Sequence, residues 1–70
     1  MIAVLGTSKY IEALWNDDQK DLAIGWARFL VGRGLSVAVV DAATLDVAAV
    51  DKALRRQTWL KKVLKERGVI

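Results

Sequence analysis

The chain contains neither cysteine nor histidine among its 70 residues, and this limits how so short a protein can be stabilised. A domain of this size buries only about 60% of the surface that its unfolded chain exposes, so its hydrophobic core is marginal. Small domains usually compensate with disulfides, a bound metal or self-association. Disulfides are excluded here, and most metal sites lack their usual ligands. We therefore expect one domain over residues 1–70, with no metal site, that forms a homodimer.

The composition is that of a packed domain, because 54% of the residues are hydrophobic and none is proline. A disordered segment would lack the apolar surface that offsets the entropy of ordering. No signal peptide follows Met1, and no window reaches the roughly 18 apolar residues of a membrane span. Together with the absence of cysteine, these features predict a cytoplasmic protein without a membrane-spanning segment.

The first third of the chain predicts a strand and then a helix. Residues 2–5 are apolar and end at Gly6, which is typical of a strand buried on both faces. A helix is expected from Lys9 to about Trp15, with Thr7 or Ser8 as its candidate N-cap.

A second helix is expected up to about Val31, capped by a side chain among residues 16–18. The residues predicted to face the core are Leu22, Ala23, Trp26, Phe29 and Leu30. Ile24 and Val31, seven residues apart, lie together on another side of this helix. A second apolar stripe implies a covering surface, so both residues are candidates for contact with a partner.

Gly32 and Gly34 end this helix. Residues 35–40 are almost continuously apolar and rich in valine, which predicts a central strand buried on both faces. The last helix is expected over residues 47–67, with Thr44 or Asp46 as its N-cap.

The predicted fold class is therefore α/β, a minimal β-α-(α)-β-α unit. Its two strands would be parallel, because the stretch between them is long enough for a crossover. Two strands alone are not a stable sheet in water, so we expect dimerisation to complete the sheet. The alternative is an all-α helical hairpin that also dimerises, since alanine, leucine and valine runs cannot be assigned by periodicity alone.

Gly6, Thr7, Ser8 and Lys9 form a candidate phosphate-binding turn. A glycine turn between a strand and a helix presents backbone N–H groups and a positive helix dipole to an anion. The glycine pattern of dinucleotide-binding folds and the P-loop pattern are both absent. The simpler interpretation is a turn followed by a helix cap.

Residues 27–42, ARFLVGRGLSVAVVDA, resemble the second half of the first unit of a dinucleotide-binding fold. This resemblance implies that Asp41 occupies the place of the ribose-binding acid and belongs to the same nucleotide site as residues 6–9. The alternative is that Asp41 caps a loop N–H group.

No residue is assigned a catalytic role and no cofactor is expected. Without histidine or cysteine, the commonest general base and the best nucleophile are missing. Asp17 and Asp18 are adjacent and point in different directions on a helix, so they suit helix capping better than a shared proton.

Basic residues are concentrated near the end of the chain. Residues 1–50 carry six acidic and four basic side chains, a net charge of −2, whereas residues 51–70 carry two acidic and seven basic ones, a net charge of +5. The last helix is thus amphipathic and cationic, with Arg55 and Lys62 on its polar side and Trp59 at the boundary. These residues predict binding to a protein partner of unknown identity or, alternatively, to nucleic acid.

Overall fold

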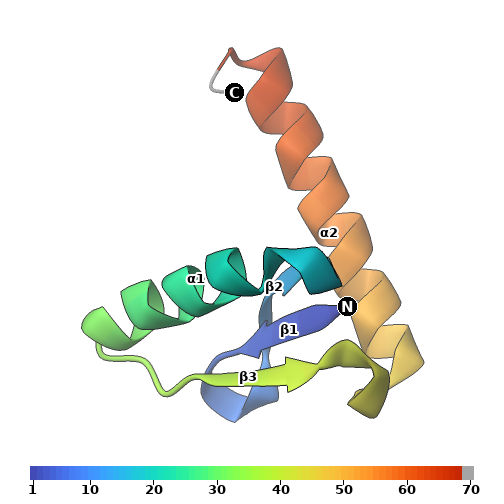
Figure 1. Cartoon of the computed structure of the whole chain (residues 1–70). Coiled ribbons are helices and arrows are strands. Elements are labelled where there is room, and N and C mark those ends of the chain that lie inside the picture. The colour runs from blue at the N-terminus through green and yellow to red at the C-terminus, as the bar shows by residue number, and fades with distance from the viewer. Residues whose placement is uncertain (69–70) are drawn as a thin grey trace.

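The structure, a computed structural model, describes residues 1–68 and shows a three-stranded sheet between two helices (Figure 1). Strand β1 (Ile2–Leu5) is followed by the short 3-10 turn η1 (Thr7–Lys9) and strand β2 (Ile11–Trp15). A second 3-10 turn, η2 (Asp17–Gln19), leads into helix α1 (Lys20–Gly32). Strand β3 (Ala38–Asp41), the turn η3 (Ala42–Thr44) and helix α2 (Val47–Glu66) complete the described chain.

The α/β class is confirmed, but the predicted parallel pair of strands is wrong, and so is the all-α alternative. The strand order is β2-β1-β3, and β1 pairs antiparallel with both neighbours. The expected helix from Lys9 to Trp15 is instead β2, which returns along β1 in a hairpin. The extra strand reverses the chain once more, so β3 runs parallel to β2 but pairs only with β1.

The hairpin turn explains why the chain reverses at this point. The N–H of Gly6 donates to the carbonyl of Tyr10 (2.7 Å), and Ser8 and Lys9 both adopt the left-handed backbone conformation, with φ of 57° and 61°. Residue pairing moves from Val4↔Ala13 to Leu5↔Ile11, so Glu12 forms a bulge. Neither left-handed position is occupied by the glycine that would have marked the turn in the sequence.

Lys9→Gly is expected to stabilise the protein by about 0.5–1 kcal/mol, because a non-glycine residue in the left-handed region costs roughly 1–2 kcal/mol and only part of this is offset by the flexibility of glycine in the unfolded chain. The thermal midpoint should rise by about 2–8 °C. Thr7→Gly is the control, since Thr7 has no positive φ and glycine there should only destabilise. Equal effects of both substitutions in thermal unfolding would contradict the prediction.

The two faces of the sheet are covered by different helices. Ala3, Leu5, Ile11 and Leu14 pack with Ala53 of α2, whereas Val4 packs with Ala23, Ala27 and Leu30 of α1. The prediction that residues 2–5 form a strand buried on both faces is confirmed. The prediction that residues 35–40 form the central strand is wrong: β3 lies at the sheet edge, and three of its four residues are exposed.

Local capping matches the sequence more closely. Asp46 caps α2, its carboxylate accepting from the N–H of Ala49 (3.3 Å). The predicted cap of the second helix by a side chain among residues 16–18 is wrong, because α1 has Gln19 at its N-cap position and no side-chain cap there. Asn16 instead precedes η2, where the side chain of Gln19 accepts from the N–H of Asn16 (3.0 Å). Helix α2 begins at the predicted residue and ends one residue before the predicted end.

Candidate interaction surface

Helix α1 places its small residues on the sheet and its large ones in solvent. Ala23 is fully buried and Ala27 is buried with it, whereas Leu22 is 54% exposed, Trp26 38% and Phe29 50%. The prediction that Leu22, Trp26 and Phe29 face the core is therefore wrong. Alanines four residues apart let the helix backbone approach the strands closely. The bulky side chains on the adjacent side of the helix then point past the sheet into solvent.

The exposed aromatic side chains on this side of α1 contact one another. The rings of Trp26 and Phe29 stack with centroids 5.2 Å apart, and the guanidinium of Arg33 lies 5.8 Å from the centre of the Phe29 ring. Leu22, Trp26 and Phe29 thus form one apolar ridge along α1, which we call the α1 ridge. Ridges of this kind, exposed and aromatic, are typical of interaction surfaces.

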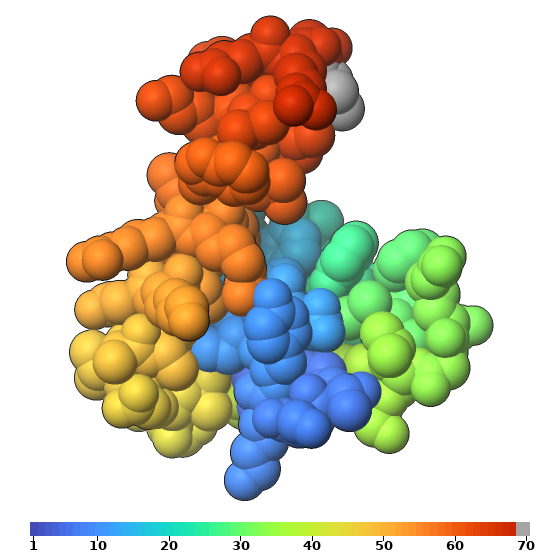
Figure 2. Space-filling model, turned by 180° about the vertical axis from the view of Figure 1, so that it is seen from behind, coloured from blue at the N-terminus to red at the C-terminus, as the bar shows by residue number. Residues whose placement is uncertain are grey.

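Helix α2 extends well beyond the sheet. Its 20 residues span about 30 Å, whereas strands of four or five residues span only about 13–17 Å. Figure 1 shows the second half of α2 rising away from α1 and the strands, and Figure 2 shows it standing clear of the rest of the molecule. We call residues 58–66 the α2 arm.

The apolar stripe of α2 continues into this arm. Val50, Ala53 and Leu54 pack against the sheet cluster. At about 100° per residue, Leu60 and Leu64 lie on the same side of the helix, about two and three turns beyond Ala53. The sheet ends before reaching them, so Leu60 is exposed.

A groove lies between the arm, β2 and α1. Its volume is about 350 Å³, and its walls include Trp26 from α1, Ala13 and Trp15 from β2, and Leu60 and Leu64 from the arm. The lining is mainly apolar and comes from all three elements. The indole N–H of Trp15 is buried without a hydrogen-bond partner.

At the floor of the groove, a side chain of α2 forms hydrogen bonds with the backbone of β2. The side-chain amide of Gln57 accepts from the N–H of Leu14 and donates to its carbonyl, both at 3.0 Å. Arg56 holds the start of β2, next to the hairpin turn. It donates to the carbonyl of Ile11, and its guanidinium lies 4.7 Å from the centre of the Tyr10 ring. These contacts satisfy backbone groups of Ile11 and Leu14 on the outer edge of β2, which would otherwise be free to pair with another strand.

Acidic side chains are concentrated in η2 and the first turn of α1, the segment that also carries Gln19 of the groove lining. Asp17, Asp18 and Asp21 are all exposed. Asp17 forms the single ion pair found within residues 1–68, with the amine of Met1 (2.6 Å), and this hydrogen bond raises the pKa of the amine.

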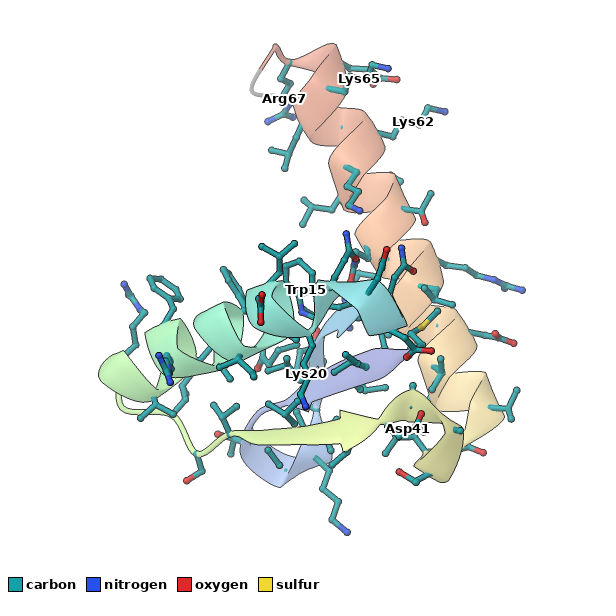
Figure 3. All side chains as sticks on the ribbon, in the orientation of Figure 1. Trp15, Lys20, Asp41, Lys62, Lys65 and Arg67 are labelled. Atoms are coloured by element: carbon teal, nitrogen blue, oxygen red, sulfur yellow. The ribbon has the colours of Figure 1, made fainter. Side chains whose placement is uncertain are left out.

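The opposite side of α2 is polar and basic. Arg55, Trp59 and Lys62 follow one another at helical spacing and are exposed, Trp59 by 62%. Lys62 points away from α1 in Figure 3. The sequence assigned these three residues to one binding surface, and the structure places them on one face of the helix, turned away from the groove.

Ile24 and Val31 lie on the other flank of α1, nearer β3. Val31 is exposed and Ile24 is half-buried. The structure therefore does not bring these two residues together with Arg55, Trp59 and Lys62. The α1 ridge was missed as a surface, although the spacing of Ala23 and Ala27 was a signal for close helix packing that would have placed the larger residues outside.

The two parts of the candidate nucleotide site are far apart in the fold. Asp41 pairs with Ile2 at the start of β1, whereas residues 6–9 follow the end of β1. The resemblance to a dinucleotide-binding unit required parallel strands, whose ends would have met. The side chain of Asp41 instead accepts from the N–H of Ala43 (3.0 Å), so the capping interpretation is confirmed.

The turn at residues 6–9 is not followed by the helix on which phosphate binding depended, because residues 11–15 form β2. The side chain of Glu12 also folds against Gly6, where a Cβ would lie 2.5 Å from its carboxylate oxygen. A negative charge at this position opposes a phosphate.

Residues 1–68 show neither a metal-binding cluster nor a membrane-spanning helix. They contain no group of three acidic side chains arranged to hold a metal ion. No helix in the same range has the length and hydropathy needed to cross a bilayer.

Comparison of the chain with protein-family models, curated proteins and solved structures found no significant match.

Proposed function

We propose that this protein is a non-enzymatic binding module that acts through protein–protein contacts and self-associates as a homodimer. The observation that carries the proposal is the orientation of α1, which buries Ala23 and Ala27 while Leu22, Trp26 and Phe29 stay exposed. A helix that only completed its own core would bury its largest apolar side chains.

The second support is the α2 arm. Helical segments shorter than about 12 residues are marginal in water without tertiary packing. The arm is the end of a longer helix and lacks the sheet packing that Val50, Ala53 and Leu54 receive, and its leucines lie beside the groove. A protein surface that covers both would stabilise the arm and remove apolar area from water.

Affinity capture with matched variants tests this function. The wild-type protein should retain its partner, identified by mass spectrometry, with an untagged copy of this chain among the bound proteins. Phe29→Ala should reduce capture at least about tenfold, because aromatic anchors often contribute 2 kcal/mol or more to an interface. Arg28→Ala, an exposed change about 100° around α1 from Phe29, should leave it unchanged. Capture of nothing by the wild type, its own copy included, would overturn the proposal.

Nucleic-acid binding is the second candidate, favoured by the exposed face of Arg55, Trp59 and Lys62. Two cations with an aromatic side chain between them can contact phosphates and stack on a base. This face is turned away from the groove, so both activities can coexist on one molecule.

A mobility-shift assay at about 50 mM salt tests this candidate, with affinity falling steeply as salt rises. Lys62→Ala should weaken binding and lower the salt dependence by about one counterion. Lys20→Ala, at the start of α1, is the control of equal charge. Absence of a shift with single-stranded and double-stranded probes would rule out this activity.

A further inference from the structure

We propose that the groove of each molecule receives the α2 arm of a second copy of this chain, in a reciprocal twofold dimer. This inference rests on the proposed homodimer and assigns its surface. Each chain supplies one arm and one groove, so two copies cover both unpartnered surfaces at once.

The shape of the molecule supports a reciprocal contact. The arm projects beyond α1 and the sheet (Figure 1), and the groove lies in the corner where the arm leaves them. A second arm laid in this corner would meet Trp26 on one side and Leu60 and Leu64 on the other. A twofold axis would place the first arm in the corner of the partner, which closes the assembly without leaving a free surface for further copies.

The charges favour this arrangement over a simple pairing of arms. The chain's basic charge is concentrated in residues 51–70 and its acidic charge in residues 1–50. An arm that contacted only another arm would bring like charges together. An arm lying in the groove instead meets Glu12, an acidic residue of the groove lining.

Basic residues lie on the groove side of the arm, to which a second copy would bring its Glu12. Lys61 lines the groove side, and Arg67, just beyond the end of α2, lies on the side of the helix opposite Lys62 (Figure 3). Within residues 1–68 neither forms an ion pair in its own chain. The dimer would give partners both to these basic side chains and to the exposed apolar side chains of the arm.

Disulfide crosslinking tests the geometry, because the natural chain contains no cysteine. One chain carries Leu64→Cys on the groove side of the arm, and a second chain with a different tag carries Leu22→Cys on the α1 ridge. Mixing and mild oxidation should link the two chains. The control pair uses Lys62→Cys on the outer face of the arm with the same Leu22→Cys chain, and should crosslink at least about tenfold more slowly.

Sedimentation equilibrium provides the second measurement, with thermal unfolding to verify that each variant is folded. The wild type should be a dimer at on the order of 100 μM. Leu64→Glu should be a monomer that remains folded, since Leu64 contacts the groove and not the sheet cluster. Lys62→Ala should remain a dimer.

The outcomes separate this inference from the proposed function. A wild-type dimer whose two cysteine pairs crosslink at equal rates would overturn the arm-in-groove contact and leave self-association standing. A wild-type monomer at on the order of 100 μM would overturn the dimer itself. In that case, capture of a different protein that depends on Phe29 would still support a binding function.

Discussion

Replacing Gln57 by alanine is expected to destabilise the protein by about 2–3 kcal/mol, a large share of the stability of a domain of this size. The substitution removes both hydrogen bonds between the side-chain amide and the backbone of Leu14. It leaves the N–H and carbonyl of Leu14 without partners in a partly buried position, which is more costly than losing an exposed bond. The thermal midpoint should fall by roughly 10–20 °C.

The measurement is chemical denaturation of Gln57→Ala beside Gln57→Leu and Thr58→Ala. Leucine restores most of the volume but neither hydrogen bond, so Gln57→Leu should be nearly as unstable as Gln57→Ala. Thr58 is the exposed neighbour on the same helix, and its replacement should change stability by less than about 0.5 kcal/mol. A small effect at Gln57 would mean that water satisfies Leu14 and that α2 does not hold the edge of β2.

The second large effect is expected at the contact between α1 and the sheet. Ala23→Leu should destabilise the protein by about 1–3 kcal/mol, because Ala23 is fully buried and a larger side chain would force the helix away from the strands. Leu22→Ala, at the neighbouring position, should change stability by less than about 0.5 kcal/mol. The sequence pattern alone predicts a loss of several kcal/mol for that change, because it places Leu22 in the core.

Denaturation of the two variants at low protein concentration decides between these orientations. Low concentration matters because Leu22 also belongs to the proposed dimer surface. Gly25→Ala is the control: a Cβ at this position meets no atom within 4 Å, so alanine should stabilise α1 by up to about 1 kcal/mol. A costly Leu22→Ala together with a tolerated Ala23→Leu would show that α1 is rotated the other way.

The parts of the fold that the sequence predicted correctly depend on local signals. Asp46 marks the start of α2, and the apolar run of residues 2–5 marks β1, because capping and burial pattern are properties of a few neighbouring residues. The basic face of Arg55, Trp59 and Lys62 follows from helical spacing alone. These predictions needed no knowledge of the sheet.

The predictions that failed depended on distant contacts. Residues 11–15 have apolar residues at spacings that fit a helix, and they become a strand because β1 and Gln57 satisfy their backbone. Ser8 and Lys9 give no glycine signal for the hairpin that reverses the chain. Without this hairpin, the two predicted strands run parallel and Asp41 lies beside the first turn. The wrong parallel sheet and the wrong nucleotide site therefore have the same cause.

The rotation of α1 was a different kind of error. A helical wheel gives an arc of apolar residues and predicts that the centre of this arc is buried. The structure centres the buried side on the alanines instead, because the distance between helix and sheet is set by the smallest side chains at the contact.

The central claim is that the apolar stripe of the α2 arm is covered by another copy of the chain. Hydrogen exchange measured across a range of protein concentrations tests it most directly, since amides of an uncovered helical arm open easily while those of the core do not. We expect the amides of residues 58–66 to become more protected as concentration rises, while those of β1 stay constant. Rapid exchange throughout the arm at every concentration would contradict the claim.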